Sequence, residues 1–265
     1  MKSIVRIPLC LLVLALASCK DSPAAKQTAL GGHPDGKAEP ESAAQPEVSN
    51  NGFTQAQLEF LNLDKEKRAD FARHLGDAKR LFDQKNISEC LAALDDASAI
   101  FRDSPEVHNI RGACYIEKRG FDRALEEFES AAALAPNNPS IEFNIGEVYF
   151  VTKQWQKALG SFEKLIPKQP TQQVHFCRLV EFKIMLCKKQ LGRNDEALEL
   201  AGKYDTTDNS PFPWYAKAVS AFEAKNPELA EEWLESAARK FSDTHELAPW
   251  QDTLIEYGYM VQGGL

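Results

Sequence analysis

Apolar and polar residues follow the period of a helix from Phe53 to the end of the chain. Apolar residues there recur at intervals of three and four positions, and no run alternates residue by residue as a half-buried strand would. The pattern opens on a capping signal, because Thr54 is followed three positions later by Gln57. We therefore predict an all-α fold, with a first helix over about residues 54–69.

The helical region repeats itself. Five pairs of identical residues lie 34 positions apart, namely Gly112 and Gly146, Tyr115 and Tyr149, Ala124 and Ala158, Phe128 and Phe162, and Pro136 and Pro170. Small residues at such positions suit two helices that cross closely, so we expect Gly112 to lie against Ala124. Proline lacks the N–H that a helix needs, so Pro136 should end the second helix of a pair.

The two stretches that carry this spacing, RGACYIEKRGFDRALEEFESAAALAPNNP and IGEVYFVTKQWQKALGSFEKLIPKQP, resemble tetratricopeptide repeats. The resemblance implies an α-solenoid of about five helix hairpins with a C-terminal capping helix. A bundle without repeated stacking is the alternative. Ala197 follows Ala158 by 39 positions, so about five residues are inserted, and we expect them to lengthen the helix over 173–190.

The repeat spacing, the N-terminal charge and apolar pattern and the composition of residues 20–52 together divide the chain into predicted segments. They are a signal peptide (1–18), a lipidated, disordered tether (19–52), an N-terminal helix (53–70), and a solenoid over 71–265. Its units cover about 71–104, 105–138, 139–172, 173–210 and 211–244, and a capping helix follows them.

In the family that the chain resembles, the first helix of each hairpin lines a concave surface that holds a peptide or a helix. If the family's geometry is carried over onto this chain, the inward-facing residues include Asn109, Ala113, Ile116, Phe143, Glu147, Phe150, Phe182, Tyr215, Val219 and Phe222. Large apolar patches on a soluble protein usually mark contact sites. The hypothesis is that this surface binds an apolar or aromatic segment of a partner. The alternative is that the rings pack against the N-terminal helix or the tail. Some repeats of this family clamp a C-terminal carboxylate with Lys and Asn pairs on this surface. The corresponding positions here hold Asn109 and Ala113 and no lysine, so the resemblance does not extend to such a clamp.

The N-terminus has the layout of a bacterial lipoprotein signal. Lys2 and Arg6 precede an apolar stretch that is too short to span a bilayer, since about 20 residues are needed. The residues Leu16-Ala17-Ser18-Cys19 resemble a lipobox, which implies cleavage before Cys19 and attachment of acyl chains such as palmitate to it. Two or more chains make a stable membrane anchor.

Lys20 follows Cys19. In Gram-negative envelopes an Asp directly after the lipidated Cys commonly retains a lipoprotein at the inner membrane. A Lys at this position therefore favours the outer membrane, facing the periplasm. In a Gram-positive host the anchor would lie on the outer face of the only membrane. Residues 20–52 contain four prolines, no aromatic residue and few large aliphatic ones, so we expect a disordered tether.

Charge excludes one class of partner. The chain carries 31 Lys and Arg against 39 Asp and Glu, a net charge of −8. Removing residues 1–18 also removes Lys2 and Arg6 and brings the net charge near −10. An acidic balance argues against nucleic acid, whose binding needs Lys and Arg to replace counterions.

We find no catalytic constellation, cofactor motif or metal-ligand spacing, and we predict that the chain is not an enzyme. Four cysteines remain after Cys10 and Cys19, namely Cys90, Cys114, Cys177 and Cys187. Cys177 and Cys187 are about 15 Å apart on one helix and cannot bridge. Cys90 and Cys114 fall on adjacent helices and either form a disulfide or serve, like the others, as small apolar core residues.

The sequence thus predicts a membrane-anchored scaffold in the bacterial cell envelope that binds a partner protein or peptide on its concave surface. Two alternatives stay open, an accessory component of an enzyme complex that acts on cell-wall polymers and a structural spacer.

Overall fold

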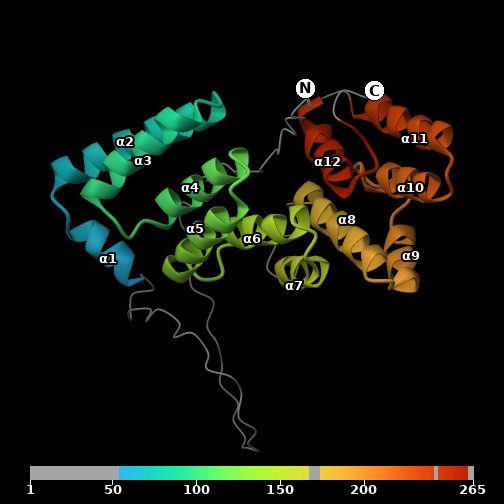
Figure 1. The fold of residues 1–265 in the computed structure, drawn as a ribbon, viewed down its shortest axis with the longest axis horizontal. Helices are drawn as coiled ribbons and strands as arrows, with labels where there is room; N and C mark the ends of the chain where they lie inside the picture. The colour runs from blue at the N-terminus through green and yellow to red at the C-terminus, as the bar shows by residue number, and fades with distance from the viewer. Residues whose placement is uncertain (1–53, 167–173, 242–243, 262–265) are drawn as a thin grey trace, which may run out of the picture.

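A computed structural model describes residues 54–166, 174–241 and 244–261. Twelve helices make up most of these residues (Figure 1). They are α1 (Gln55–Asn62), α2 (Lys65–Asp83), α3 (Ile87–Ile100), α4 (Pro105–Glu117), α5 (Phe121–Leu134), α6 (Pro139–Val151), α7 (Trp155–Leu165), α8 (Val174–Gln190), α9 (Asn194–Gly202), α10 (Phe212–Glu223), α11 (Pro227–Lys240) and α12 (Thr244–Tyr257). The signal segment, Cys19, the tether and Pro170 lie outside the described residues.

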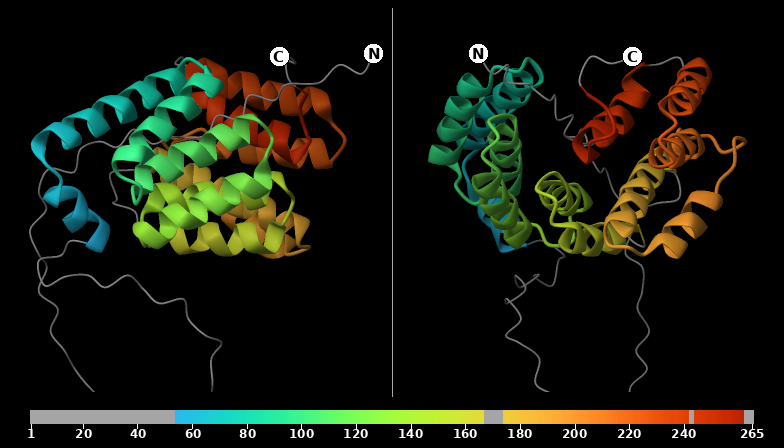
Figure 2. Two further views of the ribbon diagram at one scale, coloured as in Figure 1. Left: turned by 60° about the vertical axis from the view of Figure 1, so that its left-hand side comes forward. Right: turned by 45° about the vertical axis from the view of Figure 1, so that its right-hand side comes forward.

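The helices pair into five hairpins, as the resemblance implies, and one further helix follows them at the C-terminus. The hairpins are α2 with α3, α4 with α5, α6 with α7, α8 with α9, and α10 with α11. Successive hairpins lie side by side around a curve, and α12 lies inside that curve (Figure 2). The fold is therefore an all-α solenoid whose inner side is partly filled by its own C-terminal helix.

Each hairpin turns at one residue in the left-handed conformation. Lys85, Arg119 and Lys153 have φ values of 60°, 60° and 61° and lie 34 positions apart. The residue after each turn donates its backbone N–H to the carbonyl five residues earlier, as Gly120 does to Tyr115 at 2.8 Å. This bond closes the helix end and sends the chain directly into the next helix. The repeat seen in the side chains is thus also a repeat of the backbone.

The predicted insertion lies where the spacing placed it. The next turn, at Gly192, comes 39 positions after the turn at Lys153. α8 has 17 residues, whereas α4 and α6 have 13 each. α12 packs against this longer helix through Phe182, Lys183 and Leu186.

The N-terminal helix differs from the prediction. The expected helix over 54–69 is interrupted at Leu63, which is extended, and the chain restarts at Asp64, whose carboxylate caps α2 by accepting from Lys67 N–H at 2.8 Å. The capping box at Thr54 and Gln57 is present and starts α1. α1 is consequently a separate short helix that packs across the first hairpin.

The close approach inside a hairpin also differs in detail. A Cβ placed on Gly112 would lie 2.6 Å from the ring of Phe128, so the side chain nearest to this glycine is that of Phe128. Gly146 meets Phe162 in the same way, again at 2.6 Å. Both rings are fully buried and have no room to move aside.

This contact predicts opposite effects for two glycine substitutions. Gly112→Ala should lower the free energy of unfolding by about 1–3 kcal/mol, because the new methyl group overpacks against Phe128. Gly76→Ala, in the middle of α2 with no atom within 4 Å of the added Cβ, should raise it by about 0.5–1 kcal/mol. Chemical denaturation measures both, and equal effects at the two positions would contradict the packing described.

Candidate docking site

The predicted concave residues lie on the inside of the curve, but most of them are buried. Ile116, Phe143, Glu147, Phe150, Phe182 and Tyr215 expose 4 % of their surface or less, and Ala113 and Val219 expose none. Asn109 and Phe222 are half-buried. The expectation that this set forms an open apolar surface is therefore wrong for most of its members.

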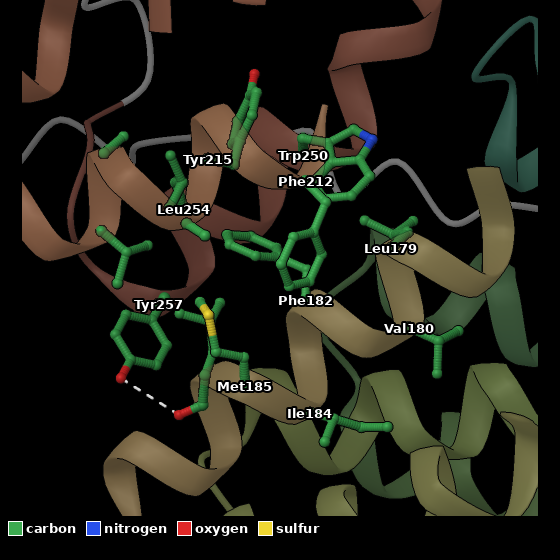
Figure 3. Close-up of a cluster of buried hydrophobic side chains, with 14 of the residues drawn as sticks. Leu179, Val180, Phe182, Ile184, Met185, Phe212, Tyr215, Trp250, Leu254 and Tyr257 are labelled. Atoms are coloured by element: carbon green, nitrogen blue, oxygen red, sulfur yellow. Dashed lines mark hydrogen bonds between the residues drawn. The ribbon is translucent and has the colours of Figure 1, made fainter. Parts of the chain in front are cut away.

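The C-terminal helix covers the second half of this set. The Trp250 ring lies 5.3 Å from Phe182 and 5.5 Å from Tyr215, measured between ring centroids. Tyr257 donates its hydroxyl to the backbone carbonyl of Leu186 at 3.3 Å (Figure 3). The rings thus pack against the chain's own last helix, whereas the alternative expected from the sequence was the N-terminal helix or the tail.

The remaining inner residues also have partners within the chain. Phe222 stacks on Tyr259, with 5.2 Å between centroids and 9° between planes. Asn109 accepts a hydrogen bond from the amide of the fully buried Asn144 at 2.9 Å, which links α4 to α6. Ile116 belongs to the hydrophobic core of the first two hairpins.

Release of α12 would be costly. Leu247, Trp250, Leu254 and Tyr257 each expose 9 % of their surface or less. At about 1.5–3 kcal/mol for each large apolar side chain, four of them contribute roughly 6–12 kcal/mol. This range is comparable to the whole stability of a typical domain. α12 is therefore part of the folded core and not a loosely held strap.

A buried charge cluster reinforces this contact. Lys183 of α8 is 2 % exposed, and its ammonium group lies 3.0 Å from Glu147 of α6 and 3.7 Å from Glu256 of α12. The same group lies 4.6 Å from the centre of the Phe150 ring. Burial alone would lower the pKa of Lys183, but Glu147 and Glu256 outweigh burial and raise it, so the lysine is charged.

The two glutamates cannot both ionise easily beside one cation. Burial raises the pKa of Glu147. Burial, together with the nearby Glu147 and Asp252, raises the pKa of Glu256 to about 8. One carboxyl group consequently keeps its proton at neutral pH, and the cluster joins three helices at little net charge.

The cluster has the residue types of an acid–base centre but not the space for one. The cavity between α12 and the inner helices, lined by Glu147, Lys183, Thr253 and Glu256, has a volume of about 10 Å³. That volume holds about one water molecule. Over residues 54–166, 174–241 and 244–261, no group of three His, Cys, Asp or Glu side chains could hold a metal ion.

An open apolar pocket lies instead at the N-terminal end of the solenoid. Its volume is about 430 Å³, and it is walled by α1, by α2 and by the link from α3 into α4. Its apolar lining includes Phe60, Leu61, Phe71, Leu75, Phe101, Pro105 and Leu134. Phe60, Phe71 and Phe101 pack edge to face or tilted, with centroids 5.2–6.0 Å apart.

The pocket has a polar rim and an exposed apolar lip. The rim is the name we use for four polar residues of the lining, Gln57, Lys79, Asp103 and Glu106. Leu61 exposes 48 % of its surface, unusual for a leucine within a docked helix. A pocket of this size and lining can take one or two apolar side chains, while the rim can bind polar groups on either side.

Sequence reasoning missed this pocket for an identifiable reason. It treated 54–69 as one helix, whereas the pocket exists because the chain breaks at Leu63 and folds α1 back over α2. The available signal was Asp64, a good capping residue at the start of a second helix. Phe60, Phe71 and Phe101 also stand outside the 34-residue pattern.

Family models match the chain over its first hairpins. A model described as tetratricopeptide repeat matches residues 75–139, and one described as YpiA-like, tetratricopeptide repeats, matches residues 115–169. None of the curated proteins matches the chain.

Three solved structures are similar to part of this chain. PilF of Pseudomonas aeruginosa is 16 % identical, with 73 % of this chain and 97 % of that chain covered and a TM-score of 0.52. YrrB, described as a TPR protein with an unusual peptide-binding site, is 22 % identical over 66 % of this chain and 88 % of that one, with a TM-score of 0.47. MamA from MSR-1 is 21 % identical over 68 % and 99 %, also with a TM-score of 0.47. The likeness to PilF supports the fold alone.

The buried charge cluster predicts how stability changes with pH. In the unfolded chain Glu256 ionises near its ordinary value of 4.5, whereas in the folded chain it holds its proton up to about pH 8. Between these values the folded state binds more protons, so raising the pH lowers the free energy of unfolding, by at most about 1.4 kcal/mol per pH unit. Glu256→Gln stays neutral and should flatten this slope and stabilise the protein at pH 8.

Urea denaturation at pH 5, 6, 7 and 8 measures the slope. Glu235→Gln is the matched control, because Glu235 of α11 is 61 % exposed and pairs only with Arg239 at the surface. An unchanged slope in Glu256→Gln would show that Glu256 is not buried as a neutral acid.

Proposed function

Because the chain is a tetratricopeptide-repeat protein, an interaction module by family, we propose that it is a membrane-anchored scaffold whose partner docks at the N-terminal apolar pocket. The observation that carries the proposal is a contrast between two surfaces. The C-terminal half of the inner curve is filled by α12, whereas the pocket between α1 and the first two hairpins is open and apolar. An exposed apolar surface is costly to keep unless something covers it.

The lining of the pocket indicates the partner's chemistry. Three phenylalanine rings and Leu75 favour an aromatic or large aliphatic side chain, since aromatic surfaces bury large apolar area in defined geometry. Rim groups of both signs, Lys79 with Asp103 and Glu106, suit polar backbone and side-chain groups beside that anchor. The partner is therefore a protein segment with one or two apolar anchors, and a nucleic acid would meet a chain of the wrong charge.

The membrane location belongs to the same proposal and rests on the N-terminal sequence. Leu16-Ala17-Ser18-Cys19 has the residues of a lipobox, and Lys20 follows it. Thr54, the first described residue, lines the pocket. A lipid on Cys19 would thus join the protein at the end of the solenoid that carries the docking site, in the cell envelope and, in a Gram-negative host, at the outer membrane facing the periplasm.

Substitution of the pocket lip tests the docking site. Peptides selected from a displayed random library for binding to the full chain should carry an aromatic or aliphatic anchor. Leu61→Asp should weaken their binding at least tenfold, since it places a charge against the anchor. Fluorescence anisotropy of the selected peptides measures the affinity.

A matched surface leucine supplies the control. Leu198 of α9 is 57 % exposed and does not line the pocket. Leu198→Asp should leave the affinity unchanged, and circular dichroism should show the same helicity for both variants. Binding that survives Leu61→Asp, or that Leu198→Asp reduces equally, would exclude the pocket as the docking site.

Metabolic labelling with an azido-palmitate tests the anchor. The full chain expressed in a Gram-negative host should incorporate the label, and Cys19→Ala should abolish it because the acceptor thiol is gone. Cys10→Ala removes a cysteine from the same segment and should keep the label. An unlabelled wild-type chain would refute the lipoprotein proposal and leave the docking site untouched.

A further inference from the structure

Two thiols from successive hairpins touch in the core. Cys90 of α3 and Cys114 of α4 are both fully buried, and their sulfur atoms lie 3.3 Å apart. The Cys114 thiol donates to the Cys90 sulfur, and the Cys90 thiol donates to the carbonyl oxygen of Ala78 at 3.2 Å. Nothing in the docking function uses this pair.

We propose that Cys90 and Cys114 are a disulfide site that joins the first hairpin covalently to the second. The bond requires a sulfur–sulfur distance of about 2.05 Å, so the two sulfurs need to approach by roughly 1.2 Å. Both side chains already face one another from neighbouring helices, so a small side-chain rotation brings them together. This inference goes beyond the proposed docking function, and the bond does not depend on the identity of any partner.

The oxidant is a small-molecule or protein disulfide, of the kind found in oxidising compartments. The thiolate of one cysteine attacks that disulfide, forms a mixed disulfide and releases one thiol. The thiolate of the other cysteine then attacks the sulfur attached to the chain and releases the second thiol. Two S–H bonds of the chain are lost, and the oxidant takes up the two electrons and both protons.

The bond must form before the core closes. Neither sulfur is accessible in the folded protein, so an external disulfide cannot reach them. In the unfolded chain both are accessible, and only 23 residues separate them. We therefore expect oxidation during folding and resistance of the finished bond to reductant until the protein unfolds.

The other described cysteines do not compete for this pairing in the native fold. Cys187 is buried in the core of the C-terminal hairpins, whereas Cys90 and Cys114 belong to the core of the N-terminal ones. Cys177 and Cys187 lie ten residues apart on α8, about 15 Å along the helix. The structure thus assigns one pairing among the four described thiols.

The bond would act on the walls of the docking pocket. α2 and the link from α3 into α4 line that pocket, and they belong to the two hairpins that the bond joins. Closing a loop of this length should raise the melting temperature by about 5–10 °C.

Oxidative refolding of the full chain tests the proposal. The denatured, reduced protein is refolded with oxidised and reduced glutathione, unfolded again in the presence of N-ethylmaleimide to block the free thiols, and digested with trypsin without reduction. Mass spectrometry should find residues 86–102 linked to residues 112–118, two hydrogen atoms lighter than the sum of the free peptides. Reduction under denaturing conditions should remove that species and lower the melting temperature of the refolded protein.

Two variants separate this pairing from others. Cys114→Ala should lose the linked peptide and make the melting temperature independent of redox treatment. Cys187 is also a buried thiol, and Cys187→Ala should keep both the linked peptide and the dependence of the melting temperature on redox treatment. The proposal would be overturned if the refolded protein, once unfolded, took up N-ethylmaleimide at both Cys90 and Cys114. It would also be overturned if either residue were linked to another cysteine.

Discussion

The buried ammonium group of Lys183 sets the main constraint on the C-terminal half of the molecule. Lys183 lies on α8, and its two partners, the side chains of Glu147 and Glu256, come from α6 and α12. A charge buried to this degree is tolerable only when opposite charges reach it. Glu147 supplies that opposite charge, and Glu256, which keeps its proton, closes the site as a neutral carboxyl group from α12. The aromatic rings around the cluster supply most of the apolar contact that holds α12 inside the curve of the solenoid.

This constraint divides the solenoid into two parts with different roles. In the C-terminal part, the inner helices and α12 share one core that includes Phe150, Phe182 and Trp250. In the N-terminal part, the first two hairpins have their own core and leave an apolar pocket beside α1. The filled half gives rigidity, and the open half offers the surface that an interaction module needs. The charge cluster looks catalytic by composition alone, but its cavity admits about one water molecule, so it serves the fold.

The repeat was predictable because its signals are local. The spacing of 34 residues gives the hairpins, and the shift to 39 between Ala158 and Ala197 gives the longer α8, since each depends on residues near one another in sequence. The openness of the inner surface was not predictable in the same way. Phe143, Phe150 and Phe182 produce the same periodic pattern whether their inner face meets solvent or another helix, and that helix lies about 70 to 110 residues further along the chain. The pocket was missed because its walls depend on one extended residue, Leu63, where neither glycine nor proline marks a break.

Native-state hydrogen exchange, read peptide by peptide, tests the central claim most directly, because it compares the stability of α12 with that of its seat on α8. If α12 is part of the core, its amides exchange only through the opening that releases α8, with the same free energy and the same dependence on denaturant. Exchange of α12 at a free energy several kcal/mol below that of α8 would contradict the account, since the inner curve would then open readily and the predicted concave residues would again be available to a partner.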